Sequence, residues 1–404
     1  MKNPVCLLVL LCLISAESHA QKDIAQWRGP ERNGVYPEKN LLTGWPAGGP
    51  QLVWKYDSLG AGFSSAAVTS QRIYTVGTID SVSYIFIFDH SGNLLSRKPL
   101  GREWMANWPG IRATPAIYGG LGYVVNGFGV LYCFSPENGD IIWSRDIMRD
   151  FNGRNQLYGF CENLVIDGNK LFCTPGGIEA NVVALNRKTG DLIWTSRVNS
   201  DSCTYANPIL IETNGKKFLI DQTQKTLFAL DAENGNLAWK YELKSGLHPN
   251  TPIYRDGYLF VYDGSDEGSI MLKIDEDGTG AGKVWNNPEF MPIQGDAVAL
   301  GDRLYGLGGG DKKFMCSDWK TGKEIYADSV NAVVITVISA ENLIYSYDIR
   351  GNFRLLKPVE NGFEKLGSFR VKGGSGLHCS HPVIQDGRLY VRHDNSLFVY
   401  NIAK

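Results

Sequence analysis

The sequence lacks several features that would each indicate a particular class of protein. Its 40 Lys and Arg residues nearly balance its 42 Asp and Glu residues, and it has no long basic run. Nucleic-acid binding, which depends on a basic surface, is therefore not indicated. None of the eight cysteines forms a Cys-x-x-Cys pair, so neither a common zinc motif nor covalent haem attachment is suggested. No helical periodicity follows the first twenty residues.

Long apolar runs are also missing, except at the N-terminus. There, Lys2 precedes an apolar run from Val5 to Ile14, and Ser18-His19-Ala20 follows with small residues. We interpret residues 1–20 as a secretory signal peptide cleaved near Ala20, because this run is too short to span a membrane. We therefore expect a soluble bacterial protein that is exported, periplasmic or secreted, and that has no transmembrane segment.

Glycine and aromatic residues are abundant instead, with 46 Gly, 19 Tyr, 17 Phe and 10 Trp. Three stretches are nearly the same phrase: ALDAENGNLAWKY from Ala229, ALNRKTGDLIWTS from Ala184 and CFSPENGDIIWSR from Cys133. A β-type repeat of roughly 45 residues is typical of propeller blades. The glycine of the phrase recurs at intervals of 40–51 residues, as Gly92, Gly139, Gly190, Gly235, Gly280, Gly322 and Gly362.

Each repeat predicts four antiparallel strands joined by short loops, which is one blade. Asn-Gly, Thr-Gly and Ser-Gly pairs supply the positive φ angles that tight hairpin turns need. An aromatic residue stands four positions after the turn glycine in several repeats, as Trp143, Trp194, Trp239 and Tyr326. We expect this side chain to pack on the turn of the next blade and so to tie neighbouring blades together.

The chain contains eight such units, and the last one is short of a strand. It ends in LFVYNIAK after three strands, whereas Gln51–Asp57 supplies an unassigned strand with Trp54 where a tryptophan is due. We therefore predict an all-β fold, an eight-bladed β-propeller of four-stranded antiparallel blades whose last blade is closed by the N-terminal strand. The predicted organisation is a signal peptide over 1–20, an N-terminal extension or cap over 21–50, and the propeller over 51–404.

The repeated phrase Ala-x-Asp-x-x-Asn-Gly-x-x-x-Trp at 229–239 resembles the tryptophan-docking repeat of the pyrroloquinoline-quinone (PQQ) dehydrogenases. It equally resembles the repeat of their non-enzymatic relatives, such as the propeller lipoprotein of the outer-membrane barrel-assembly machinery. The stretch WRGPERNG, residues 27–34, is similar to the start of exported PQQ-like propeller proteins. The resemblance runs from about Trp27 to the C-terminus and implies the fold, which hosts both oxidoreductases and scaffolds.

The cysteines outside the signal peptide divide into two groups. Cys133 and Cys316 occupy the position that holds alanine in other repeats, so we expect small core residues there. Cys161 and Cys203 are the candidates that we consider for a disulfide bond, with the connectivity left open.

The loops that lead into the innermost strands of a propeller gather on one face around the central channel. In this chain those loops carry polar residues from different blades, so they define a candidate pocket. Buried polar groups of this kind can also simply satisfy one another and ordered water. The residues concerned are Ser64, Ser65, Arg112, Thr114, Glu162, Asn163, Tyr205, Asn207, His248, Asn250, Gln294, Asp296, His378 and His381.

The resemblance implies one specific enzymatic hypothesis, a dehydrogenase that uses PQQ and calcium. Glu162 and Asn163 would then be calcium ligands, Asp296 the catalytic base, and Arg112 a clamp on the cofactor's carboxylates. Asn207 and Asn250 would complete the cofactor site. However, the chain lacks the adjacent Cys-Cys pair of the alcohol-oxidising members, and it is far shorter than they are.

We therefore favour a non-catalytic binding or scaffold protein without a cofactor and keep the quinoprotein as the alternative. The loop REWMANWPGIR places Trp104 and Trp108 where they could stack on a sugar ring or contact a protein partner. Further candidate ligand-binding residues are His248, His378 and His381, although two histidines are too few to indicate a transition-metal site. The expected partners are a protein, a carbohydrate or a small molecule at the channel face, bound by a monomer.

Overall fold

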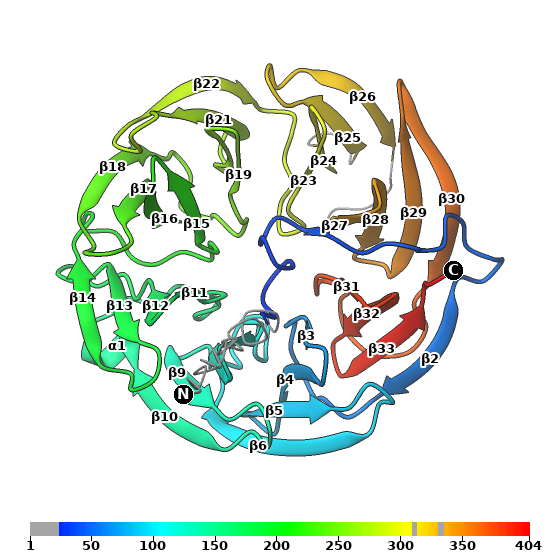
Figure 1. Ribbon diagram of the computed structural model, residues 1–404, viewed down its shortest axis with the longest axis horizontal. Helices are drawn as coiled ribbons and strands as arrows, with labels where there is room; N and C mark the ends of the chain where they lie inside the picture. The colour runs from blue at the N-terminus through cyan, green and yellow to red at the C-terminus, as the bar shows by residue number, and fades with distance from the viewer. Residues whose placement is uncertain (1–23, 309–312, 330–334) are drawn as a thin grey trace, which may run out of the picture.

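Eight β-sheets surround a central channel in the computed structural model, which describes residues 24–308, 313–329 and 335–404 (Figure 1). The predicted signal peptide, residues 1–20, lies outside these ranges. Among the described residues the only helix is α1 (Ile147–Asp150), and no helix is long and apolar enough to cross a membrane. The prediction of an eight-bladed, all-β propeller is thus confirmed.

The strands follow the chain blade by blade. The first four blades contain β3 (Ala67–Val68), β4 (Ile73–Ile79), β5 (Val82–Phe88), β6 (Leu94–Arg102); β7 (Ala116–Tyr118), β8 (Leu121–Val125), β9 (Val130–Phe134), β10 (Ile141–Asp146); β11 (Val165–Asp167), β12 (Lys170–Cys173), β13 (Val182–Asn186), β14 (Leu192–Ser196); and β15 (Ile209–Thr213), β16 (Lys216–Gln222), β17 (Thr226–Asp231), β18 (Leu237–Glu242).

The remaining blades begin near residue 253. They contain β19 (Ile253–Arg255), β20 (Tyr258–Tyr262), β21 (Ser269–Ile274), β22 (Ala281–Asn287); β23 (Val298–Leu300), β24 (Arg303–Leu307), β25 (Lys313–Asp318), β26 (Glu324–Ser329); β27 (Ile335–Ala340), β28 (Leu343–Asp348), β29 (Asn352–Val359), β30 (Gly362–Arg370) with β1 (Val35–Tyr36); and β31 (Val383–Gln385), β32 (Arg388–His393), β33 (Ser396–Asn401) with β2 (Gln51–Tyr56).

The N-terminal strand closes the ring as the sequence predicts. Strand β2 pairs antiparallel with β33, with Leu52 opposite Tyr400 and Trp54 opposite Val399. The eighth blade is therefore built from both ends of the chain, which protects the outer edge of β33. The seventh blade differs from the prediction because the short strand β1 adds to its inner edge, parallel to β27, and makes five strands.

Tryptophan side chains connect neighbouring blades through the turn glycines. Trp194 lies over Gly235 of the following blade so closely that a Cβ atom built on this glycine would stand 2.6 Å from the indole. Similar contacts join Trp54 to Gly92, Trp143 to Gly190 and Trp285 to Gly322. The prediction is thus confirmed for Trp143 and Trp194, whereas the turn glycine of the blade after Trp239, Gly278, faces Phe218 instead. Where Ser96 replaces the tryptophan, its hydroxyl donates a 2.6 Å hydrogen bond to the carbonyl of Asn138 in the next turn.

Two details of the sequence analysis require correction. The glycine with positive φ in the fifth blade's turn is Gly278, at +76°, and not Gly280, since the insertion in DEDGTGAG shifts the turn by two residues. Cys161 and Cys203, considered for a disulfide bond, are both free thiols. Cys133 and Cys316, in contrast, are fully buried core residues as expected.

The contact between Trp194 and Gly235 can be tested by comparison with Gly215. This glycine has a similar backbone conformation, but no side chain packs against it. Gly235 and Gly215 have φ of +76° and +70°, and a Cβ on Gly215 would meet no atom within 4 Å. We predict that Gly215→Ala lowers the free energy of unfolding by about 1 kcal/mol through backbone strain. Gly235→Ala should cost about 1–3 kcal/mol more, because it also displaces the indole.

Equilibrium unfolding in denaturant measures both changes. Equal losses of stability in the two variants would show that the indole contact contributes nothing.

Candidate functional site

A ring of hydrogen bonds joins the blades at the start of their first strands. In seven blades the residue two positions before the first strand is polar: Ser65, Thr114, Asn163, Asn207, Thr251, Asp296 and His381. Asn207 Oδ1 accepts from the backbone N–H of Asn163 at 3.1 Å and from its Nδ2 at 2.7 Å. Asn163 Oδ1 in turn accepts the N–H of Thr114 at 2.6 Å. These polar side chains therefore position neighbouring blades relative to one another.

The N-terminal segment, drawn in dark blue, crosses the centre of the ring of blades (Figure 1). Arg28, almost fully buried, forms an ion pair with Asp296 in which Nη1 lies 3.3 Å from Oδ2. Its Nη2 donates to the carbonyl of Ala297 at 2.6 Å, and Nη1 lies 3.3 Å from His381 Nδ1. Trp27 completes the contact, since its Nε1 donates to Thr251 Oγ1 at 2.9 Å. One short segment thus contacts the fifth, sixth and eighth blades.

A second arginine of the same segment serves the other side of the channel. Arg32 donates three hydrogen bonds to backbone carbonyls, at 2.7 Å to Asn163, 3.1 Å to Leu164 and 3.0 Å to Pro208. Burial lowers the pKa of its guanidinium to about 10. Because a charge inside a protein needs polar partners, these carbonyls are what allow the arginine to be buried.

Two buried carboxyl groups, Glu162 and Asp221, lie near Arg32. The N–H of Thr174 donates to Glu162 Oε2 at 2.8 Å, and the hydroxyl of Thr174 donates to Asp221 Oδ2. Burial raises the pKa of Asp221 to about 7, and burial together with the charge of Asp221 raises that of Glu162. The free oxygens Glu162 Oε1 and Asp221 Oδ1 have no partner among the described residues. The pair therefore favours at least one protonated carboxyl.

A pocket of about 260 Å³ opens at the mouth of the channel, above Trp27. Its wall is mainly aromatic: the ring of Trp108 lies edge-on to Phe63 with centroids 5.5 Å apart, and Tyr158 and Tyr205 lie 5.6 Å apart. Among the residues that the structure describes, no Asp or Glu lines it. The polar lining consists of Arg112, Asn163, Asn207, Gln294 and His381.

The donors of this pocket are only partly used by the protein. Arg112 Nη2 donates to the carbonyl of Tyr158, whereas Asn207 Nδ2 makes no hydrogen bond within the part of the chain that the structure describes. Trp108 and Gln294 have left-handed backbones, with φ of 55° and 58°. Such conformations are costly for residues other than glycine and tend to cluster at functional sites. The mouth pocket can therefore bind a flat ligand, whose face would pack on the aromatic rings and whose acceptor groups would bind the free donors.

The structure brings together seven of the predicted site residues at this pocket, namely Trp108, Arg112, Asn163, Tyr205, Asn207, Gln294 and His381. Asn250 lies beside it, and its Nδ2 donates to the carbonyl of Pro292 at 2.5 Å. Glu162 and Asp296 contribute no lining surface to the pocket.

Three further predicted residues, Trp104, His248 and His378, lie elsewhere on the molecule. Trp104 does not line the pocket and packs against Phe128, with ring centroids 5.6 Å apart. His248 is buried, and its Nε2 lies 2.9 Å from the carbonyl oxygen of Gln224. His378 lines a different hollow, together with Arg370.

Sequence reasoning missed Arg28 and Arg32, which decide what fills the channel. The stretch WRGPERNG carried a signal, since two arginines in a segment rich in Gly and Pro need partners if they are buried. The partners themselves, Asp296 and the carbonyls of the third and fourth blades, are too distant in sequence to be paired without the fold.

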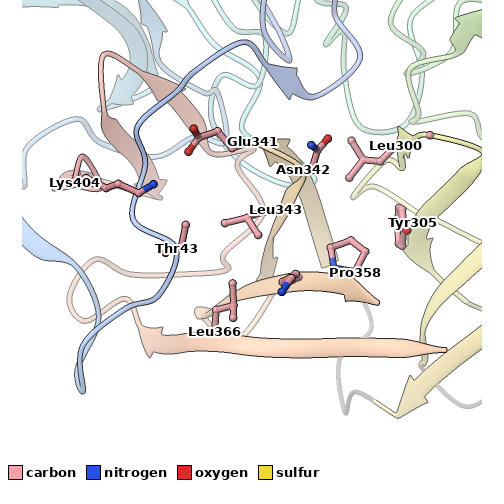
Figure 2. A pocket seen from close by; sticks show the side chains of 11 residues that line it. Thr43, Leu300, Tyr305, Glu341, Asn342, Leu343, Pro358, Leu366 and Lys404 are labelled. Atoms are coloured by element: carbon pink, nitrogen blue, oxygen red, sulfur yellow. The ribbon is translucent and has the colours of Figure 1, made fainter. Parts of the chain in front are cut away.

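A larger hollow of about 700 Å³ lies at the other end of the first strands, between the sixth and seventh blades (Figure 2). Two of its charged side chains already have partners: Glu341 accepts the N–H groups of Asn40 and Leu41 at 2.8 Å, and Lys357 pairs with Glu364 at 3.3 Å. None of the predicted site residues lines it. We therefore take the channel mouth as the candidate site.

The ring of blades and the tryptophan docking define a PQQ-like β-propeller. The PQQ_2 family model, described as outer membrane protein assembly factor BamB, matches residues 38–327, which is well over half of the chain. The chain belongs to this family. Among curated relatives it is 24% identical over 242 residues to quinohemoprotein alcohol dehydrogenase from Comamonas testosteroni, a match of 52% of this chain but 33% of that protein.

A relative of the other kind is similarly distant. The outer membrane protein assembly factor BamB of Yersinia pestis is 25% identical over 172 residues, which cover 41% of this chain and 40% of that protein. The matches thus span well under two thirds of the curated relatives' length.

The solved structures similar to this chain also include both an assembly factor and a dehydrogenase. BamB from Moraxella catarrhalis has a TM-score of 0.60 at 12% identity, covering 87% of this chain and 97% of that one. A europium-containing methanol dehydrogenase has a TM-score of 0.64 at 12% identity, covering 91% and 89%. Both likenesses establish the fold alone.

The buried carboxyl pair predicts how stability changes with pH. Because burial places the folded-state pKa of Asp221 above its ordinary value of about 3.9, the folded protein binds this proton more tightly than the unfolded chain does. Stability should therefore fall as the pH rises from about 4 to about 7. Asp221→Asn removes this titration, while its amide oxygen can still accept the hydroxyl of Thr174.

Thermal unfolding of both proteins between pH 4.5 and 8.5 tests the prediction. We expect the stability of Asp221→Asn relative to the parent to increase with pH, whereas Asp256→Asn, at an exposed turn, should show no such trend. A constant difference between Asp221→Asn and the parent would contradict it.

Proposed function

We propose that this chain is an exported, non-catalytic binding protein of the PQQ-like family, whose ligand or partner is held at the mouth of the channel. The observation that carries the proposal is the position of the segment from Trp27 to Gly34, which fills the channel. Arg28 takes Asp296 as its ion-pair partner at 3.3 Å. The residue that a dehydrogenase would need as its base is thereby committed to the protein's own structure.

The predicted calcium and quinone residues do not fit a shared site. Glu162 is buried and does not line the pocket, and its Oε2 accepts a hydrogen bond from the N–H of Thr174. The amide of Asn163 is bonded at both ends, to Thr114 and Asn207. Among the described residues no three His, Cys, Asp or Glu side chains are grouped so as to hold a metal ion. Of the predicted cofactor residues, Arg112, Asn163 and Asn207 line the pocket, and among these three only Arg112 carries the positive charge that would bind cofactor carboxylates.

The chemistry of the pocket favours a small ligand with a flat apolar face and acceptor groups, of which a sugar ring is the simplest. Trp108 and Phe63 offer apolar ring surface, and aromatic rings bind the apolar face of a sugar well. Arg112 and the free Nδ2 of Asn207 are donors for its oxygens. With no Asp or Glu in the lining, a cationic ligand would find no counter-charge.

A thermal-stability titration of the purified protein separates this proposal from the enzymatic alternative. We expect no saturable stabilisation by PQQ with calcium and no dye-linked alcohol oxidation. Among mono- and oligosaccharides, a binder should stabilise the folded state by about 2.7 kcal/mol at a hundredfold excess over its Kd. Trp108→Ala should abolish this effect, while Trp104→Ala, a tryptophan of the same loop outside the pocket, should retain it.

The opposite pattern would contradict the proposal. Saturable stabilisation by PQQ with calcium, accompanied by oxidase activity that Asp296→Asn removes, would identify a quinoprotein. Equal loss of saccharide binding in Trp104→Ala and Trp108→Ala would place the ligand away from the mouth pocket.

A further inference from the structure

A separate hollow of about 400 Å³ lies next to the channel mouth, between the seventh and eighth blades. The two sites are neighbours, because His378 lines this hollow and Cys379 lines the mouth pocket. Its lining includes two arginines, two histidines and part of the glycine-rich loop KGGSG, but no carboxylate among the described residues. This composition differs sharply from the aromatic wall of the mouth pocket.

The two arginines have unused hydrogen-bonding capacity. Arg370 Nε donates to the carbonyl of Arg350 at 3.1 Å, which holds the two residues side by side. The terminal nitrogens of both guanidinium groups form no hydrogen bond or ion pair within the described part of the chain. Two carboxylates lie close to the lining residues, and both have partners. Asp348 is bound to Asn352 and to Arg354, with an Arg354 Nη2 distance of 2.9 Å, and Asp394 Oδ2 accepts the hydroxyl of Ser375 at 2.5 Å. The guanidinium groups of Arg350 and Arg370 therefore remain available to bind a ligand.

His378 presents a donor to the same hollow. It is more than nine-tenths buried, stacks on His393 with ring centroids 3.4 Å apart, and has Nδ1 hydrogen-bonded to the hydroxyl of Tyr347. Burial raises the pKa of Tyr347, so its hydroxyl keeps the proton and donates it to Nδ1. Burial, followed by the effect of His393, lowers the pKa of His378 to about 4. The neutral ring then carries its proton on Nε2, which has no partner among the described residues.

The glycine-rich loop adds backbone donors. His393 faces the carbonyl oxygens of Gly373 and Gly376, at 2.7 Å from Nδ1 and 3.1 Å from Nε2. Since a peptide unit is planar and trans, the N–H groups of Gly374 and Leu377 point away from His393. None of the N–H groups from Lys372 to His378 donates to another described residue. Loops with positive-φ glycines, here Gly373, Gly374 and Gly376, commonly bind anions through such groups.

We propose that this hollow binds the phosphate group of a small ligand, through the guanidinium groups of Arg350 and Arg370, Nε2–H of His378 and the N–H groups of the KGGSG loop. Arginine forks match the oxygens of phosphate in paired hydrogen bonds. A carboxylate offers roughly four acceptor sites, which is fewer than the hydrogen-bond donors of this hollow. A tetrahedral oxyanion has more acceptor sites and can therefore bind more of these donors. The site is independent of the ligand bound at the channel mouth.

Calorimetric titration of the purified protein with inorganic phosphate, at constant ionic strength, tests the proposal. We expect saturable binding that Arg350→Gln and Arg370→Gln each weaken about tenfold or more, as the loss of a charged hydrogen-bond partner should. Both side chains are exposed, so the variants should unfold at the parent's temperature. Arg149→Gln, which removes an exposed arginine of α1 far from the hollow, is the matched control and should bind as the parent does.

A second arm distinguishes the free ion from a phosphate ester. Glucose 6-phosphate should compete with inorganic phosphate in the parent protein, whereas glucose should not compete. The proposal is overturned if the parent shows no saturable phosphate binding, if Arg149→Gln weakens binding as much as Arg350→Gln does, or if glucose competes equally well.

Discussion

The burial of Arg28 and Arg32 in the central channel is the constraint on which the rest of this structure depends. The N-terminal segment contacts residues at the starts of the first strands of several blades. A guanidinium inside a protein must be compensated, and the compensation here comes from Asp296 on one side and backbone carbonyls of the third and fourth blades on the other. The segment also contributes Trp27 to the lining of the pocket at the channel mouth.

The mouth pocket and the neighbouring hollow differ in the chemistry of their lining residues. Trp108 and Phe63 give the mouth pocket an apolar wall with few donors, whereas Arg350 and Arg370 make the adjacent hollow cationic. Trp108, Phe63 and Arg350 lie in loops or turns, and Arg370 is the last residue of β30. Both sites therefore lie at the ends of the blade strands, away from the turn glycines and the docked tryptophans, where a propeller of this family can vary its sequence without changing the fold.

The fold could be predicted from the sequence because its signals are local and repeated. In several repeats the turn glycine stands four residues before an aromatic residue of the same phrase, and the missing eighth outer strand pointed to Gln51–Tyr56. The error at Gly280 arose where an insertion broke the repeat.

The candidate site was harder to predict, since it depends on contacts between distant residues. Asn163 and Glu162 are neighbours in sequence, yet only Asn163 lines the pocket, because successive side chains leading into a strand point to opposite sides. Asp296 is polar and correctly placed near the channel, but its partner Arg28 lies 268 positions earlier in the chain. No local pattern connects these two residues, and the pairing decides whether Asp296 is free.

Hydrogen exchange of the backbone amides from Trp27 to Gly34 tests the central claim most directly. In the structure the N–H of Arg32 donates to the carbonyl of Gly29 at 3.1 Å, and that of Gly34 donates to Arg28 at 3.0 Å, inside the channel. We predict that these amides are protected as strongly as those of the inner strands, and that adding PQQ with calcium leaves them unchanged. Rapid exchange at Arg32 and Gly34, or exposure of the segment when the quinone is added, would show that the channel opens to a cofactor and would contradict a non-catalytic role.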